Sequence, residues 1–159
     1  STPVVTGETL YTKEQFAQVF EKRAADILNP DICAVGGILQ MLDIAAMAHP
    51  HAVAISPHNY NSPVVGLAAT VHLSALIPNF LIAECFINLS EACAEIAAPG
   101  LTVENGWVDL PTAPGLGVDI DVEALRRRPY KDFPHKDMRQ YWEEFPRKNY
   151  VWGEANVTR

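Results

Sequence analysis

The stretch Val53-Ala54-Ile55-Ser56-Pro57-His58 shows the pattern that decides the fold: a short β-rich run followed within a few residues by an ionisable side chain. Similar β-rich runs start at Val4, Ile27 and Phe80, so successive runs begin 23, 26 and 27 residues apart. The segments between the runs have helical character. Strands that alternate with helices at this spacing predict a parallel sheet with right-handed crossovers, which is an α/β architecture.

Helix signals support this alternation. Thr12 followed by Gln15 is a capping-box signature, and an apolar face of helical period follows Gly36-Gly37. Ser62-Pro63 predicts an N-cap followed by proline at the first helical position. A doubly wound sheet and a (β/α)₈ barrel both fit this rhythm. No nucleotide-binding glycine motif follows any β-rich run, which argues against the usual dinucleotide-binding fold.

Composition excludes several classes of protein. The chain has 159 residues and a formal net charge of -7, which argues against a nucleic-acid-binding surface. No apolar run reaches roughly 18 residues, and no basic-then-apolar leader opens the chain, so we expect neither a membrane span nor a signal peptide. The 3 cysteines form no metal-ligand spacing and predict buried thiols in a reducing, cytoplasmic compartment.

Length and strand count disagree. By length alone the chain suggests one complete domain, whereas a (β/α)₈ barrel needs about 250 residues. The sequence offers four β-rich runs, all within residues 1–97, and an irregular proline-rich stretch follows over residues 98–159. On the barrel interpretation, the chain is therefore half a barrel plus an irregular tail.

Four ionisable residues follow the four β-rich runs in turn: Glu8, Asp31, His58 and Glu84. The carboxyl ends of parallel barrel strands meet at one face, where barrel enzymes perform their chemistry. Each residue alone has a structural explanation as a helix cap or a hydrogen-bonded surface group. Their occurrence at the same position after four consecutive runs indicates an active site.

These residue types suit proton removal next to a carboxylate. Asp31 could hold the imidazole of His58 in one tautomer, so that His58 acts as a base. Glu8 is a hard oxygen ligand suited to Mg²⁺, and Glu84 could donate a hydrogen bond to an oxyanion. Together they predict abstraction of a proton α to a carboxylate, with a metal stabilising the enediolate.

Several motifs, in this order and spacing, resemble the mandelate racemase subgroup of the enolase superfamily over most of residues 1–125. They are Val4-Val5-Thr6-Gly7-Glu8, Asn29-Pro30-Asp31, Gly36-Gly37-Ile38, Ser56-Pro57-His58, the run from Ile77 to Glu84, and Gly115-Leu116-Gly117-Val118. The resemblance implies the C-terminal half of a modified TIM (β/α)₇β barrel, comprising strands five to eight.

The resemblance also implies roles for these residues. Asp31 and His58 match the catalytic dyad, Glu8 the third Mg²⁺ ligand, and Glu84 the acid that hydrogen-bonds the substrate carboxylate. The other two metal ligands belong to earlier strands, and the tail over residues 98–159 would pack on an N-terminal capping domain. We therefore expect a piece of a larger enzyme, with the N-terminal part of the same enzyme as its partner.

The predicted activity is that of a Mg²⁺-dependent acid-sugar dehydratase, a carbon–oxygen lyase that converts a sugar acid to a 2-keto-3-deoxy acid in a homo-oligomeric enzyme. A racemase, epimerase or cycloisomerase of the same superfamily is an alternative, because these enzymes use similar dyads. Another is that the isolated half-barrel is not a catalyst. The loop residues Asn59, Tyr60 and Asn61 are candidate substrate contacts, because loops at this face border the pocket.

Overall fold

The computed structural model describes residues 2–60, 62–87 and 90–129. The chain divides into two units, Ser1–Arg127 and Arg128–Arg159, and the fold given below is that of the first. Residues 130–159, nearly half of the predicted proline-rich tail, lie outside the described residues. Within the described part, no helix is both long and apolar enough to span a bilayer.

Three short strands form a parallel sheet in the order β1-β2-β3, which confirms the predicted α/β alternation. They are β1 (Val5–Thr6), β2 (Ile27–Leu28) and β3 (Ala54–Ile55). Val5 pairs with Ile27, and Ile27 pairs in turn with Ala54. This in-line register brings the carboxyl ends of all three strands to one edge.

The fourth β-rich run, at Phe80, lies beside β3 but forms a parallel bridge with Ile55 instead of a regular strand. The backbone amide of Leu81 donates to the Ile55 carbonyl (2.9 Å), and the Pro57 carbonyl accepts from the Glu84 amide (3.0 Å). Pro57 has no N–H, so the ladder bond expected between these two contacts is missing. The residues of the predicted fourth strand thus lie parallel to β3, but their hydrogen bonds to β3 are interrupted and they do not form a regular strand.

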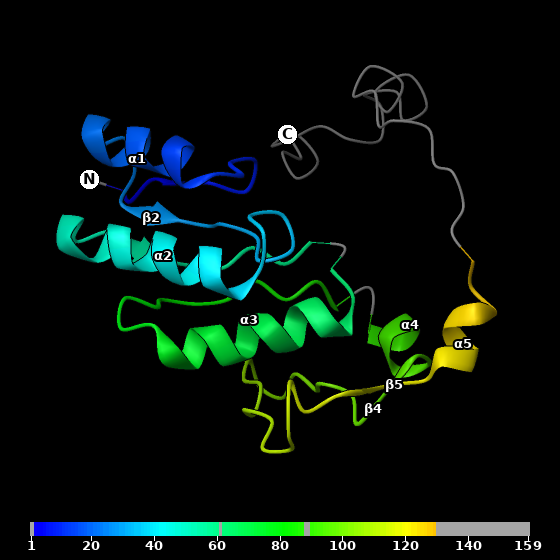
Figure 1. Ribbon diagram of the computed structural model, residues 1–159. Helices are drawn as coiled ribbons and strands as arrows, with labels where there is room; N and C mark the ends of the chain where they lie inside the picture. The colour runs from blue at the N-terminus through cyan, green and yellow to red at the C-terminus, as the bar shows by residue number, and fades with distance from the viewer. Residues whose placement is uncertain (1, 61, 88–89, 130–159) are drawn as a thin grey trace, which may run out of the picture. The chain divides into compact units, whose positions relative to one another are not determined.

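Three helices pack in a row along the sheet (Figure 1), with α2 in contact with both α1 and α3. They are α1 (Lys13–Lys22), α2 (Ile38–Ala48) and α3 (Val64–Leu76), and a 3₁₀ turn, η1 (His49–His51), follows α2. The core joins their apolar faces to the strands and includes Phe16, Leu28, Met41, Ile44, Ile55 and Leu73.

The starts of these helices test the capping predictions. Thr12 accepts a hydrogen bond from the Gln15 amide, and the Gln15 side chain bonds back to the cap, so the predicted capping box is confirmed. At α3 the prediction is one residue early. Pro63 is itself the N-cap and Val64 is the first helical residue, and no side chain caps the helix.

The remaining elements are shorter. They are α4 (Ser90–Ala94), β4 (Ala97–Ala98), β5 (Asp119–Ile120) and α5 (Val122–Arg126), and β4 pairs antiparallel with β5. β4 has one residue on each side of the predicted domain boundary at residue 97, and its partner strand lies in the predicted second range.

Candidate active site

The four ionisable residues predicted from the strand ends lie together in the structure. Glu8 follows β1, Asp31 follows β2 and His58 follows β3, while Glu84 follows the bridge beside β3. A parallel bridge between Asp31 and His58 extends the alignment of β2 and β3 beyond the regular ladder. The parallel register therefore gathers the other three side chains around the His58 imidazole.

Asp31 holds one side of that imidazole. Its Oδ2 lies 2.9 Å from His58 Nδ1, and its Oδ1 accepts a hydrogen bond from the backbone amide of Cys33 at 2.8 Å. The Asp31 side chain is buried, with 9% of its surface exposed, and that of His58 is 16% exposed. A carboxylate fixed on both oxygens favours the tautomer with hydrogen on Nδ1, which leaves the Nε2 lone pair available as a base.

Nε2 faces two further carboxylates. Glu8 Oε2 lies 3.3 Å away and Glu84 Oε2 lies 3.5 Å away, and both side chains are about half exposed. Glu84 Oε2 also accepts a hydrogen bond from the Asn59 amide at 3.1 Å. Nε2 thus lies at the more exposed side of the cluster.

The surroundings of Glu8 suit a role for its carboxylate as one ligand of a hard cation. Its carboxylate is accessible, and three carboxylates surround a single imidazole at this edge, so the site favours positive charge. Among the described residues, no group of three or more His, Cys, Asp or Glu side chains could hold a metal ion. Any Mg²⁺ bound by Glu8 would need further ligands from outside these residues.

The loop after His58 contains the predicted substrate contacts. Asn59 is buried and Tyr60 is exposed, while Asn61 lies outside the described residues. The Tyr60 ring is tilted against the His58 ring, with centroids 6.3 Å apart, and against that of Phe86 at 4.7 Å. Tyr60 therefore forms part of the wall beside the imidazole.

Two contributions to the site were missed from the sequence. The backbone amides of Cys33 and Asn59 orient the carboxylates of Asp31 and Glu84. An aspartate that bonds the amide two residues later is an Asx turn, so the Asp-x-Cys spacing held a weak signal for the first contact. The second joins two segments distant in sequence and had no local signal.

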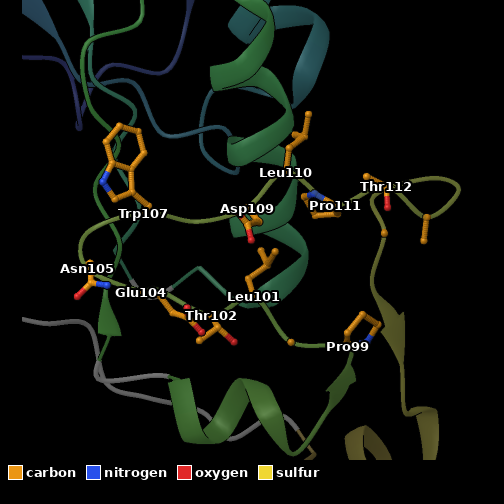
Figure 2. Close-up of a pocket in the computed structure, with 13 residues that line it drawn as sticks. Pro99, Leu101, Thr102, Glu104, Asn105, Trp107, Asp109, Leu110, Pro111 and Thr112 are labelled. Atoms are coloured by element: carbon orange, nitrogen blue, oxygen red, sulfur yellow. The ribbon is translucent and has the colours of Figure 1, made fainter.

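A cavity of about 610 Å³ lies along residues 99–117, and its lining includes none of the four residues Glu8, Asp31, His58 and Glu84 (Figure 2). Trp107, which is 78% exposed, stands on its wall together with the carboxylates of Glu104 and Asp109. Two carboxylates and no cation among the described lining residues make this cavity a poor site for an acid. The cluster around His58 is therefore the better candidate.

Comparisons with known proteins agree on one family. Residues 1–125 match the family described as enolase C-terminal domain-like. A D-galactonate dehydratase from Ralstonia pickettii is 34% identical over 160 residues, which cover 97% of this chain and 38% of the relative. A D-xylonate dehydratase from Haloferax volcanii is 31% identical over 125 residues, covering 79% of this chain and 30% of the relative.

The fold matches a solved structure of the same kind. The mandelate racemase/muconate lactonizing enzyme from Jannaschia sp. CCS1 aligns with a TM-score of 0.77 and 32% identity, covering 84% of this chain and 34% of that one. The chain therefore spans 30–38% of the length of these three proteins.

Proposed function

Because the chain belongs to the enolase C-terminal domain-like family of the enolase superfamily, we propose that the protein containing it dehydrates an acid sugar. The observation that carries the proposal is the orientation of His58, with Nδ1 on Asp31 and Nε2 toward the accessible side. The dehydratase names of the Ralstonia and Haloferax relatives favour dehydration among the reactions that such a dyad can perform.

In the proposed reaction, His58 Nε2 removes the proton α to the substrate carboxylate, and the electron pair of that C–H bond forms an enediolate. The same imidazole, now protonated, gives its proton to the β-hydroxyl as the C–O bond breaks and water leaves. The enol that remains takes up a proton at C3 as it becomes a 2-keto-3-deoxy acid. Asp31 keeps the imidazole oriented throughout, because both of its oxygens are already engaged.

The two glutamates have separate roles in the proposal. Glu84 hydrogen-bonds the substrate carboxylate, where negative charge accumulates. Glu8 would be one ligand of a Mg²⁺ ion, which would supply positive charge to stabilise the negative charge that develops on the substrate. The remaining ligands, and the lid that closes over the substrate, would come from other parts of the protein.

A panel of aldonic and aldaric acids, incubated with the complete protein and Mg²⁺, tests this proposal. We expect release of a 2-keto acid, detected as its semicarbazone, from at least one member of the panel. Exchange of the α-hydrogen with inversion and without a keto acid would reject dehydration in favour of racemisation or epimerisation. Lactone rearrangement without loss of water would favour a cycloisomerase.

A further inference from the structure

Gly7 joins the end of β1 to Glu8 in a backbone conformation that favours glycine. It is buried, and its φ of +134° lies in a region that residues with a side chain rarely adopt. Its carbonyl accepts a hydrogen bond from the Leu10 amide at 3.0 Å. This bond closes a β-turn in which Glu8 is the residue directly after Gly7, so the conformation of Gly7 sets the direction in which the turn leaves the sheet.

The surroundings of Gly7 leave no room for a side chain. A Cβ atom at this position would lie 3.2 Å from the backbone nitrogen of Asn29, 3.3 Å from its Oδ1 and 3.2 Å from Phe16 Cε1. Neither neighbour can give way easily. The Asn29 amide donates to the Thr6 carbonyl at 3.0 Å, and Phe16 is 0% exposed in the core. A side chain at residue 7 would therefore shift the backbone of residue 7 itself.

Such a shift would pass directly to Glu8. The Glu8 side chain is 56% exposed, so packing does little to hold it and the backbone largely sets its position. Mg²⁺ requires near-ideal octahedral geometry with oxygen ligands at about 2.0–2.1 Å. A carboxylate displaced by a few tenths of an ångström is therefore a weaker ligand for this ion.

We propose that Gly7 is a positioning residue for Glu8. Its missing side chain lets the end of β1 lie against Asn29 and Phe16, and this close approach sets where the Glu8 carboxylate can meet Mg²⁺. The inference rests on the proposed function, in which Glu8 is a metal ligand, and adds a residue that acts through the backbone. The effect of Gly7 is on the affinity for the ion and not on proton removal by His58.

Isothermal titration calorimetry of the complete protein with Mg²⁺ tests this role. Gly7→Ala should raise the Kd for Mg²⁺ about tenfold or more, as is typical when a group that orients a metal ligand is lost. Raising the Mg²⁺ concentration should then restore kcat in the keto-acid assay, because the Asp31–His58 pair is unchanged.

Gly106→Ala is the matched control. Gly106 also has a positive φ, of +83°, but a Cβ there would have no neighbour within 4 Å among the described residues. It lies in the turn between Glu104 and Trp107, away from the converging carboxylates, so this variant should leave the Kd for Mg²⁺ unchanged.

A third variant, Glu8→Gln, separates the inference from the proposed function. If Glu8→Gln weakens Mg²⁺ binding while Gly7→Ala binds the ion as tightly as Gly106→Ala does, the positioning role is overturned and the proposed function stands. If Glu8→Gln leaves the Kd unchanged, the metal-binding role of Glu8 is overturned together with that of Gly7.

Gly7→Ala in a Phe16→Leu background keeps the test available if the single variant does not fold. Phe16→Leu removes the Cε1 atom that the new Cβ would meet, whereas both contacts with Asn29 remain. The double variant should fold, as measured by circular dichroism, and bind Mg²⁺ more weakly than Phe16→Leu alone. Loss of the fold in both Gly7→Ala proteins, with Gly106→Ala folded, would show that Gly7 serves the core and would overturn its assignment to Glu8.

Discussion

At the scale of single residues, Asp31 holds Nδ1 of the His58 imidazole, and Nε2 faces the half-exposed carboxylates of Glu8 and Glu84. The Cys33 amide donates to the other oxygen of Asp31, so the proposed dyad is already held together without a bound substrate. Pre-assembly matters because a positioned base contributes typically 10²–10⁴-fold to a proton transfer.

The cysteines give a prediction about pH. Burial raises the pKa of the Cys85 thiol, and the neighbouring Cys93 and Glu84 raise this pKa further. Because the thiolate is the nucleophile, iodoacetamide should modify Cys85 more slowly at pH 8 than the exposed Cys33. The labelling rate of Cys85 should still be rising at a pH above the ordinary thiol pKa.

Peptide mass spectrometry of timed alkylation, repeated between pH 7 and pH 10, measures both rates in one sample. Equal modification of Cys85 and Cys33 at pH 8 would contradict the partial burial of Cys85. The prediction that the thiols are buried is wrong for Cys33, which is exposed.

The candidate site could be predicted from sequence to the extent that it depends on side chains at strand ends. The sequence identified four site residues because each follows a β-rich run at a similar position, and the structure brings them together: Glu8, Asp31, His58 and Glu84. The amides of Cys33 and Asn59 could not be found with equal ease, because every residue carries a backbone N–H. That Asn59 Nδ2 is buried without a hydrogen-bond partner among the described residues also depends on its neighbours in space, which the sequence does not show.

At the scale of elements, two prolines set where the regular ladder ends. β2 and β3 are each followed by a proline, at Pro30 and Pro57, just before the dyad residues. Neither proline can donate to a neighbouring strand, and the regular strands end before them, at Leu28 and Ile55. The sequence pattern located the β-rich runs. Whether a residue joins the ladder of hydrogen bonds between strands also depends on which residue of the neighbouring strand lies opposite it.

The capping box of α1 predicts a measurable contribution to stability. Thr12→Ala should lower the free energy of unfolding by about 1 kcal/mol, because the Gln15 amide loses its acceptor. Thr9→Ala, at an exposed threonine in the preceding turn, should change it by less than about 0.5 kcal/mol. Urea unfolding of the complete protein followed by circular dichroism measures both, and equal effects would mean that the cap is not what stabilises α1.

At the scale of the whole molecule, both margins of the described sheet expose apolar side chains. Val4 and Val5 are 52% and 53% exposed on one margin, and Leu81 and Ile82 are 54% and 64% exposed on the other. Margins of this kind attract further strands. The covered share of the relatives, 30–38%, fits a unit that packs against the rest of a longer protein.

The 159-residue chain alone should therefore self-associate as its concentration rises, and it should not dehydrate acid sugars in the presence of Mg²⁺. Sedimentation velocity at several concentrations, with the keto-acid assay on the same samples, measures both properties. A monodisperse chain with dehydratase activity would show that no other part of the protein is needed.

The central claim is that His58 removes the α-proton of an acid sugar. The most direct measurement follows D-galactonate by NMR in D₂O with the complete protein, its His58→Asn variant and the control His49→Asn, at an exposed histidine in η1. The account predicts a deuterated 2-keto-3-deoxy acid from the first and third proteins, and neither product nor α-exchange from His58→Asn. Product formation by a folded His58→Asn protein at an undiminished rate would contradict it.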